Sequence, residues 1–285
     1  MATYPRTGIQ RILAGSVDPV LRVTFLDQDG EPVGSAPSGV TCTITRADGT
    51  VIATGRTTTA SGADLTCALT TAEAASLDVL SAVWTDDGAV RARSYHRLVG
   101  GFLFTIAELD ALGGVSTFTA VQKRAARDAV TDMIERETGV CWNTTYDRDE
   151  FEGHDRTVLV AKRRPIQTVR EFTIENVQVA TTYNVNAAAG LVTPTVHGSL
   201  SMCGWVVFGY EHGFNAPPHD LSEAAAHATK LRLLGRTSGI GERVRSISDE
   251  QGTRTFSFAG PGHPTGVDEI DAVINAHDMR DPAVF

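Results

Sequence analysis

Apolar and polar residues alternate along much of residues 17–104, and a period of two is the pattern of β-strands with one buried face. The alternation is clearest in residues 20–26, where one face carries Leu21, Val23 and Phe25. Asp-Gly pairs at 48–49 and 87–88 interrupt it, and such pairs favour tight hairpin turns. This part of the chain is therefore predicted to consist of short antiparallel strands.

Turn signals recur at short intervals in the same part of the chain, and no long helical pattern intervenes. This organisation is typical of a β-sandwich, so residues 14–102 are predicted to form an all-β, immunoglobulin-like (Ig-like) domain. Trp84 is expected in its core because a buried indole covers a large apolar area. The preceding residues, 1–13, contain a proline and a glycine and are predicted to be an N-terminal arm.

After Gly101 the pattern changes to the helical period of 3.6 residues. A short helix is predicted over 105–112 and a long one over 118–138, with Gly139 as the C-cap of the long helix. The apolar stripe of the long helix is expected to consist of Val121, Ala125, Val130, Met133 and Ile134. Its charged residues, Arg127 among them, are expected on the sides that face solvent.

Residues 144–211 return to a strand-like pattern and are predicted to form a small antiparallel sheet. Helices are predicted over 221–234 and 266–277, with an extended segment between them. Residues 103–277 are therefore predicted to be an α+β domain with a helical core, followed by a C-terminal tail over 278–285. The fold class predicted for the chain is thus two domains, an N-terminal β-sandwich and a C-terminal α+β domain.

The charge balance narrows the range of partners. The formal net charge is −9, whereas gripping duplex DNA needs basic residues against phosphates, so a DNA clamp is not expected. DNA could still pass through an acidic assembly without being held. No apolar run approaches a membrane span, and the first residues lack the apolar stretch of a signal peptide. The protein is expected to be made in a reducing cytoplasm, without membrane contact.

The four cysteines are Cys42, Cys67, Cys141 and Cys203. No two of them form a CxxC pair, so a structural zinc site is not expected. Cys42 and Cys67 fall in predicted strands of one domain and could be neighbours. Two states are open for that pair, a disulfide or two buried free thiols.

Residues 206–234 carry three histidines close to acidic residues, which raises the question of a metal or catalytic site. The residues concerned are His212, His219, His227, Glu211 and Asp220. Helical metal ligands are typically four residues apart, whereas His219 and His227 are eight apart. A loop could bring His212 to His219, but nothing in the sequence requires it. Neither a metal nor another cofactor is therefore expected.

The same stretch has a structural interpretation, in which a strand turns into a helix. Pro217 and Pro218 push the residues before them towards extended geometry. Asp220 is then the candidate N-cap, and Glu223, three residues on, can complete a capping box. The apolar side of this helix is expected to consist of Leu221, Ala225, Ala228 and Leu231.

Other catalytic patterns are weaker still. The chain has neither GxxxxGK[ST] nor HExxH. A charged run with four carboxylates is interpreted as solvated: Asp147, Asp149, Glu150 and Glu152. Arg163 and Arg164 could bind phosphate, although basic residues before a proline are more typical of a solvated turn. No enzymatic activity is expected.

The order of segments in residues 103–285 resembles the head-to-tail connector (adaptor) proteins of long-tailed bacteriophages. The matching pieces are IERETGVCW (134–142), LVAKRRPIQTVREFTI (159–174), VVFGYEHGFNAPPHDLSEAAAHATKLRLL (206–234) and TGVDEIDAVINAH (265–277). Each piece alone is weak, and their order and spacing carry the resemblance. The Ig-like sandwich before them resembles an extra domain attached to some members of that family.

The resemblance implies a structural virion protein at the head-tail junction, assembled in the host cytoplasm. It implies a homo-oligomeric ring, typically dodecameric, that sits beneath the portal protein, extends the channel for double-stranded DNA and contacts a stopper or tail-joining protein. In such connectors a C-terminal segment often docks on the portal. The corresponding residues here are Val267, Ile270, Val273, Ile274, Met279, Val284 and Phe285.

Two other functional classes remain open. A sandwich joined to an α+β domain also suits a tail or baseplate module that binds carbohydrate or protein. Exposed aromatic residues on the sandwich, of which Tyr95 is the chief candidate, would favour that class. The third class is a hydrolase built around His212, His219 and Asp220, and stoichiometric zinc in the purified protein would favour it.

Overall fold

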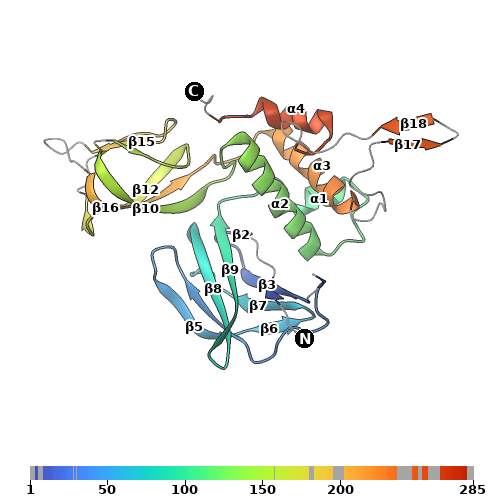
Figure 1. Ribbon diagram of the computed structural model, residues 1–285, viewed down its shortest axis with the longest axis horizontal. Helices are drawn as coiled ribbons and strands as arrows, with labels where there is room; N and C mark the ends of the chain where they lie inside the picture. The colour runs from blue at the N-terminus through green and yellow to red at the C-terminus, as the bar shows by residue number, and fades with distance from the viewer. Residues whose placement is uncertain are drawn as a thin grey trace. The chain divides into compact units, whose positions relative to one another are not determined.

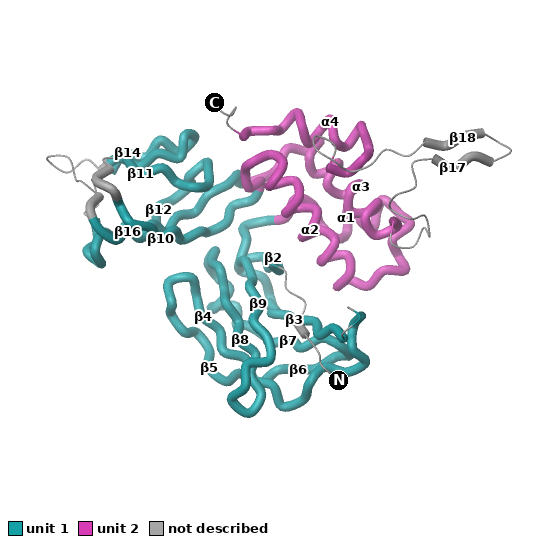
Figure 2. The backbone as a smooth tube through the Cα atoms, in the orientation of Figure 1, with its two compact units in different colours: residues 1–101, 143–215 teal, residues 102–142, 216–285 magenta. Residues whose placement is uncertain are grey.

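The computed structural model describes most of the chain (Figure 1). The described residues are 4–5, 9–27, 29, 31–156, 158–179, 183–194, 202–235, 246–249, 252–255 and 264–280. They form two compact units, each built from two separate stretches of the sequence (Figure 2). Unit 1 contains residues 1–101 and 143–215, and unit 2 contains residues 102–142 and 216–285.

The first part of unit 1 is a β-sandwich, as the alternating pattern predicts. One sheet has the strand order β2-β9-β8-β4-β5 and the other β1-β3-β7-β6. The strands are β1 (Tyr4–Pro5), β2 (Ile9–Leu13), β3 (Val20–Leu26), β4 (Thr41–Thr45), β5 (Val51–Thr57), β6 (Thr59–Ser61), β7 (Asp64–Ala68), β8 (Asp78–Asp86) and β9 (Ala89–Val99). All described pairs in it are antiparallel except β2 with β9, and the two predicted hairpins are β4–β5 and β8–β9.

Trp84 lies in the sandwich core, which confirms its predicted role as a core residue. Its indole N–H donates to Ser94 Oγ at 2.9 Å, and Ser94 Oγ lies 2.8 Å from His96 Nε2. The other ring nitrogen of His96 lies 3.1 Å from Gln10 Oε1. Because that amide oxygen can only accept, the neutral tautomer with hydrogen on Nδ1 fits both contacts. The core therefore contains a satisfied polar chain rather than isolated polar groups.

Cys42 and Cys67 are free, buried thiols in opposite sheets of the sandwich. A hydrogen bond with Cys67 and then burial raise the pKa of the Cys42 thiol, so Cys42 stays protonated. Of the two states that the sequence leaves open, the structure has the free thiols. Cys141 is also buried and free, and the side chain of Cys203 lies outside the described residues.

The second part of unit 1 contains two antiparallel sheets, where the sequence pattern predicts one. Their strand orders are β10-β16-β12-β13 and β11-β15-β14, and they share one apolar core. The strands are β10 (Thr145–Arg156), β11 (Leu159–Val160), β12 (Ile166–Ile174), β13 (Val177–Gln178), β14 (Tyr183–Asn186), β15 (Leu191–Pro194) and β16 (Met202–His212). The run around Asp147 is strand β10, which pairs with β16 along its length. Glu150 and Glu152 are exposed, as a solvated run predicts, whereas Asp147 and Asp149 are half-buried.

Unit 2 is built on four helices: α1 (Ile106–Ala111), α2 (Ala120–Thr138), α3 (His219–Gly235) and α4 (Asp268–Ala276). Thr105 and Thr119 begin α1 and α2 with complete capping boxes, and Gly139 ends α2 at a φ of 76°. The helices α3 and α4 both pack against α2. Strands β17 (Ser246–Asp249) and β18 (Gly252–Thr255) form a separate antiparallel pair. None of the described helices is long and apolar enough to span a membrane.

The predicted faces of two helices need correction. Arg127 is buried rather than solvent-facing, and its guanidinium carbon lies 3.4 Å from the centroid of the Phe102 ring. Its burial is tolerated because a cation over an aromatic face is attracted by the ring quadrupole. Ala125 on α2 and Leu231 on α3 are exposed, so one member of each predicted apolar stripe is wrong. Leu221, Ala225 and Ala228 are buried as predicted.

Candidate functional site

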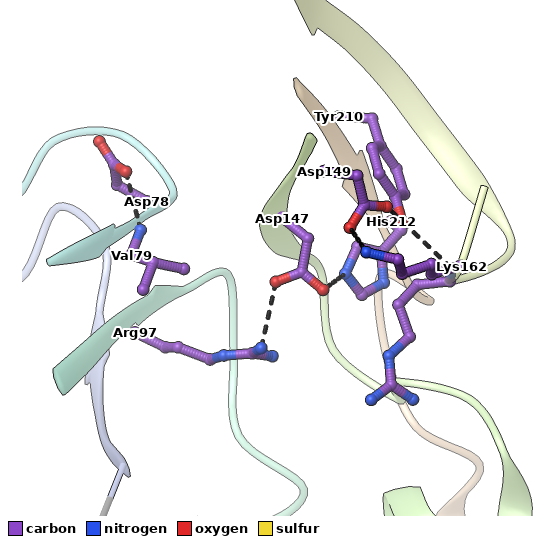
Figure 3. Close-up of polar contacts among 9 residues, drawn as sticks. Asp78, Val79, Arg97, Asp147, Asp149, Lys162, Tyr210 and His212 are labelled. Carbon is purple, nitrogen blue, oxygen red and sulfur yellow. Dashed lines mark hydrogen bonds and ion pairs between the residues drawn. The ribbon is translucent and has the colours of Figure 1, made fainter. Parts of the chain in front are cut away.

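A polar cluster of unit 1 lies where β10 begins and β16 ends (Figure 3). Asp147 accepts a hydrogen bond from Arg97 Nη2 at 3.1 Å and one from His212 Nε2 at 3.0 Å. Arg97 belongs to β9, 50 residues earlier in the chain, so the cluster joins strands that are distant in sequence. A carboxylate held by two donors is fixed in both position and charge.

The pairing of β10 with β16 explains why these side chains meet. Thr145 lies opposite His212, and Asp147 lies opposite Tyr210. Alternate residues of a strand share one face, so Thr145, Asp147 and Asp149 all lie on the face that carries the buried aromatic residues of β16. On that face the Phe208 and Tyr210 rings stack with centroids 4.6 Å apart, and the Tyr210 ring lies 5.4 Å from His212.

A second carboxylate continues the cluster. The Tyr210 hydroxyl donates to Asp149 Oδ2 at 3.1 Å and accepts from the Arg163 backbone N–H at 3.1 Å. Lys162 Nζ lies 2.7 Å from the other oxygen of Asp149. Burial and the nearby Asp149 charge raise the pKa of Tyr210, so the phenol stays protonated and serves as a donor.

The charge of Asp147 is stabilised despite its surroundings. Burial by itself raises the pKa of this carboxyl, but the hydrogen bond from His212 and the charge of Arg97 outweigh it and hold the pKa below its ordinary value. With Nε2–H donating to Asp147, the remaining His212 nitrogen is an acceptor. Neither His212 Nδ1 nor Thr145 Oγ1 has a hydrogen-bond partner in the described part of the protein.

An aspartate that orients a histidine is also found in acid–base catalysis, so the cluster has to be tested against that role. A general base must reach the proton it removes, within hydrogen-bonding distance of a substrate. His212 is 0% exposed and Thr145 is 3% exposed, so neither reaches a molecule in solvent. Arg97 also neutralises the carboxylate. The arrangement therefore suits a fixed structural tie between β9, β10 and β16.

The three histidines of the sequence motif are divided between the two units. His212 belongs to unit 1, whereas His219 and His227 belong to α3 in unit 2. His219 lies 3.4 Å from Glu223, and His227 is exposed. The neighbouring Glu211 pairs with Arg170. Among the described residues, no group of three or more His, Cys, Asp or Glu side chains is placed to hold a metal ion.

The helix cap differs from the prediction. Helix α3 begins at His219, and Pro218 supplies the first helical acceptor by receiving a hydrogen bond from the Ser222 N–H at 3.0 Å. Asp220 is therefore inside the first turn, where a carboxylate still favours the positive end of the helix. Asp220 Oδ2 lies 3.0 Å from Nε2 of His277, which is the residue that follows α4. Glu223 contacts His219 and does not complete a capping box at Asp220.

The predicted portal-docking residues fall into three groups. Ile270 and Ile274 are buried on α4. Val267 and Val273 are half-buried, and Met279 is exposed. Val284 and Phe285 lie outside the described residues. Of the described members, Met279 offers the most open apolar side chain.

Trp205 is an exposed aromatic residue that the strand-like pattern of residues 144–211 does not predict. The indole is 48% exposed, whereas Val206, Phe208 and Tyr210 are buried. Gly204 and Gly209 lie in the same strand, and Gly209 shares the Trp205 face. The glycines give no signal of this exposure, because Val207 on the same face as Gly209 is buried.

Comparison with known proteins assigns no family. No protein-family model matches the chain, and no curated protein matches it in sequence. Among solved structures, the neck of an empty gene transfer agent (GTA) particle matches with 15% identity and a TM-score of 0.41, over 62% of this chain and 91% of that chain. A chain in the virion of a native GTA particle matches with 16% identity and a TM-score of 0.44, over 63% and 91%. Similarity at this level does not assign a function.

Proposed function

We propose that this chain is a structural, non-enzymatic protein of the neck that joins head and tail in a phage-like particle. In this proposal it forms a ring beneath the portal, dodecameric as in the connector family, and extends the channel for DNA. It also contacts the next stopper or tail-joining protein. Assembly takes place in the host cytoplasm, and the finished protein resides in the virion.

The observation that carries the proposal is the structural order of the segments that resemble connectors. Residues 134–142 end α2, residues 159–174 contain β11 and β12, and residues 206–234 lead from β16 into α3. Residues 265–277 contain α4. The chain leaves the helical unit after Trp142 and re-enters it at Ala216, so two small sheets are inserted into a helical core. The resemblance thus corresponds to one consistent architecture.

The chemistry of the side chains supports a structural role. In the cluster around Asp147, His212 and Tyr210 are buried and the charge of Asp147 is paired with Arg97, so these groups are occupied in holding strands together. The net charge of −9 suits a channel wall, because basic contacts to phosphates would add affinity and slow the passage of DNA. Both features favour a scaffold over an enzyme or a DNA clamp.

We narrow the proposed docking segment by the burial of its side chains. Ile270 and Ile274 are used in packing α4 and are poorly placed to contact a partner. The proposed portal contacts are therefore Met279, the half-buried Val267 and Val273, and Val284 and Phe285 in the last residues. A terminal segment without a core of its own gains order by binding a partner.

Imaging of purified portal rings mixed with this protein tests the proposal. We expect additional ring-shaped density on one end of the portal, with a matching number of subunits. Bovine serum albumin, which is also acidic, serves as the control protein. Full-length protein that leaves the portal unchanged at micromolar concentrations would contradict the proposal.

A carbohydrate-binding module is the second candidate, and one observation favours it. Tyr95 is 53% exposed on the sandwich, and an aromatic ring of this kind can stack on a sugar. A glycan-array measurement with the full-length protein and the Tyr95→Ala variant separates the two candidates. Binding that is lost in the variant favours the module, and the neck proposal expects no binding to any glycan.

A further inference from the structure

Trp205 lies at an acidic corner of unit 1. In the β10–β16 pairing it stands opposite Glu152, and its backbone N–H donates to Glu175 Oε1 at 2.5 Å. Glu150 lies two residues from Glu152 on the same strand face. We name this group the Trp205 corner, and its members are Glu150, Glu152, Glu175 and Trp205. The corner combines a large exposed aromatic ring with carboxylates.

The negative charge of the Trp205 corner is only partly compensated. Arg148 forms ion pairs with both Glu150 and Glu171, so one guanidinium serves two carboxylates. Glu152 and Glu175 are exposed and have no basic partner among the described side chains. An exposed indole next to two carboxylates without a basic partner suits a partner surface that offers a cation and an aromatic or aliphatic side chain.

The outer face of the sandwich offers those groups. On β9, Arg93 and Tyr95 point outward, because the alternate residues Ala92, Ser94 and His96 are buried. Tyr95 lies opposite Ile9 of β2, which is 41% exposed, and Arg93 lies opposite Val83 of β8. We name this group the Tyr95 face, and its members are Ile9, Val83, Arg93 and Tyr95.

The charge of the Tyr95 face is also available to a partner. The neighbouring Arg91 pairs with Asp86, but Arg93 is exposed and has no acidic partner among the described side chains. Arg and Tyr are among the residues that contribute most to protein interfaces, and Trp is a third. The Tyr95 face and the Trp205 corner therefore complement each other in charge and in residue type.

We infer that the Trp205 corner of one copy of this chain docks on the Tyr95 face of a second copy. The two surfaces are different patches of one subunit, so the contact is head-to-tail. A dimer formed in this way still has one free Tyr95 face and one free Trp205 corner. Repetition of such a contact closes a ring when the rotation between subunits allows it. Ring closure rests on the proposed neck function, whereas the pairwise contact does not.

Sedimentation velocity of the full-length protein, over concentrations up to about 1 mM, tests this contact. We expect the wild-type chain to self-associate and the single variants Glu152→Arg and Arg93→Glu each to associate at least about tenfold more weakly. Both side chains are exposed, so each variant should retain its thermal stability. The Trp205→Ala variant should weaken association to a similar degree because it removes the aromatic anchor.

Mixing the two charge variants provides the decisive measurement. A Glu152→Arg chain retains an intact Tyr95 face, and an Arg93→Glu chain retains an intact Trp205 corner. An equimolar mixture should therefore recover the association that each variant lacks alone. Arg124→Glu, an exposed change of the same sign on α2, is the matched control and should associate like the wild type.

Three results would overturn the inference. They are a wild-type chain that stays monomeric over the whole concentration range, charge variants that associate like the wild type, and a mixture that does not recover association. Failure of the neck proposal is distinguishable from these results. Recovery in the mixture together with no portal binding supports the contact and rejects the neck role. Portal binding without self-association supports the neck role and rejects the contact.

Discussion

His96 is a single buried residue whose protonation bears on the stability of the whole sandwich. The imidazole is 0% exposed, and its two nitrogens contact Ser94 and Gln10. Burial lowers the pKa of His96 to about 4. In the unfolded chain the pKa of a histidine is about 6.5. Between these two values the unfolded state binds more protons than the folded state, so acid favours unfolding.

We predict that the free energy of unfolding falls as the pH is lowered from about 6.5 to about 4, by up to about 3 kcal/mol from His96 alone. The stabilisation is complete above pH 6.5 and is lost as the pH approaches the folded pKa. The variant His96→Gln, which keeps a neutral side chain with a donor and an acceptor, should show a flatter pH dependence. Urea unfolding at several pH values measures both curves, and equal slopes would refute the role of His96.

Gly209 allows the close approach of two side chains on β10 and β12. A Cβ atom at this position would lie 2.5 Å from the Tyr146 hydroxyl oxygen and 3.2 Å from Glu171 Cβ. Tyr146 is buried and has little room to move. The Gly209→Ala variant should therefore lose about 1–3 kcal/mol of unfolding free energy.

The control for Gly209 is Gly34→Ala, because a Cβ atom at Gly34 has no atom within 4 Å. Chemical denaturation of both variants gives the comparison. A Gly209→Ala protein as stable as the Gly34→Ala protein would show that Tyr146 is free to move aside.

At the scale of elements, the helices of unit 2 are defined mainly by their ends. In the capping box of α2, Thr119 Oγ1 accepts from the Gln122 N–H at 3.3 Å, and Gln122 Oε1 accepts from the Thr119 N–H at 2.8 Å. Both partners lie within one turn, so the box depends only on local sequence. The middle of α2 is different, because the buried Lys123 and Arg127 contact Asp110 and Phe102, which lie outside the helix.

We predict that Thr119→Ala lowers the unfolding free energy by about 1 kcal/mol, because it leaves helix N–H groups without their acceptor. Thr117→Ala removes an exposed hydroxyl from the preceding turn and is the matched control. Thermal unfolding followed by circular dichroism compares the two variants. Equal melting temperatures would mean that water replaces the cap without cost.

At the scale of the whole molecule, the C-terminal residues have two separable roles. The Met279 N–H donates to the Thr138 carbonyl at 2.9 Å, so residues just after α4 help to satisfy the end of α2. Arg280 lies against Gly139, which ends the same helix. Residues 281–285 include Val284 and Phe285, the last two members of the proposed docking segment.

Two truncations separate these roles. Deletion of 281–285 should weaken portal binding at least about tenfold, because it removes Val284 and Phe285 of the proposed docking segment. It keeps the bond from Met279 to Thr138, so the melting temperature should change little. Deletion of 278–285 should weaken binding similarly and also lower the melting temperature by about 2–4 °C, because it removes the bond to Thr138. Pull-down with portal rings and differential scanning calorimetry provide the two measurements. Unchanged portal binding of both truncations would reject the docking proposal.

The sequence by itself determined the features that depend on nearby residues. Alternation of apolar residues located the sandwich strands, and the Asp-Gly pairs located their hairpins. Helical periodicity located the helices, and Gly139 marked the end of α2. A helix end can be predicted in this way because the groups that satisfy it lie within a few residues of it. Trp84 was predictable as a core residue since so large an apolar side chain on an alternating strand has few other places to go.

Only the tertiary structure decided which of the polar residues are buried and which apolar ones are exposed. Asp147 meets Arg97 and His212 across separations of 50 and 65 residues, and local sequence does not specify such encounters. Arg127 is buried over Phe102, and Trp205 is exposed in an apolar strand. The physical reason is the same in each case. The cost of burying a charge, or of exposing a ring, depends on the partners that the fold brings to it.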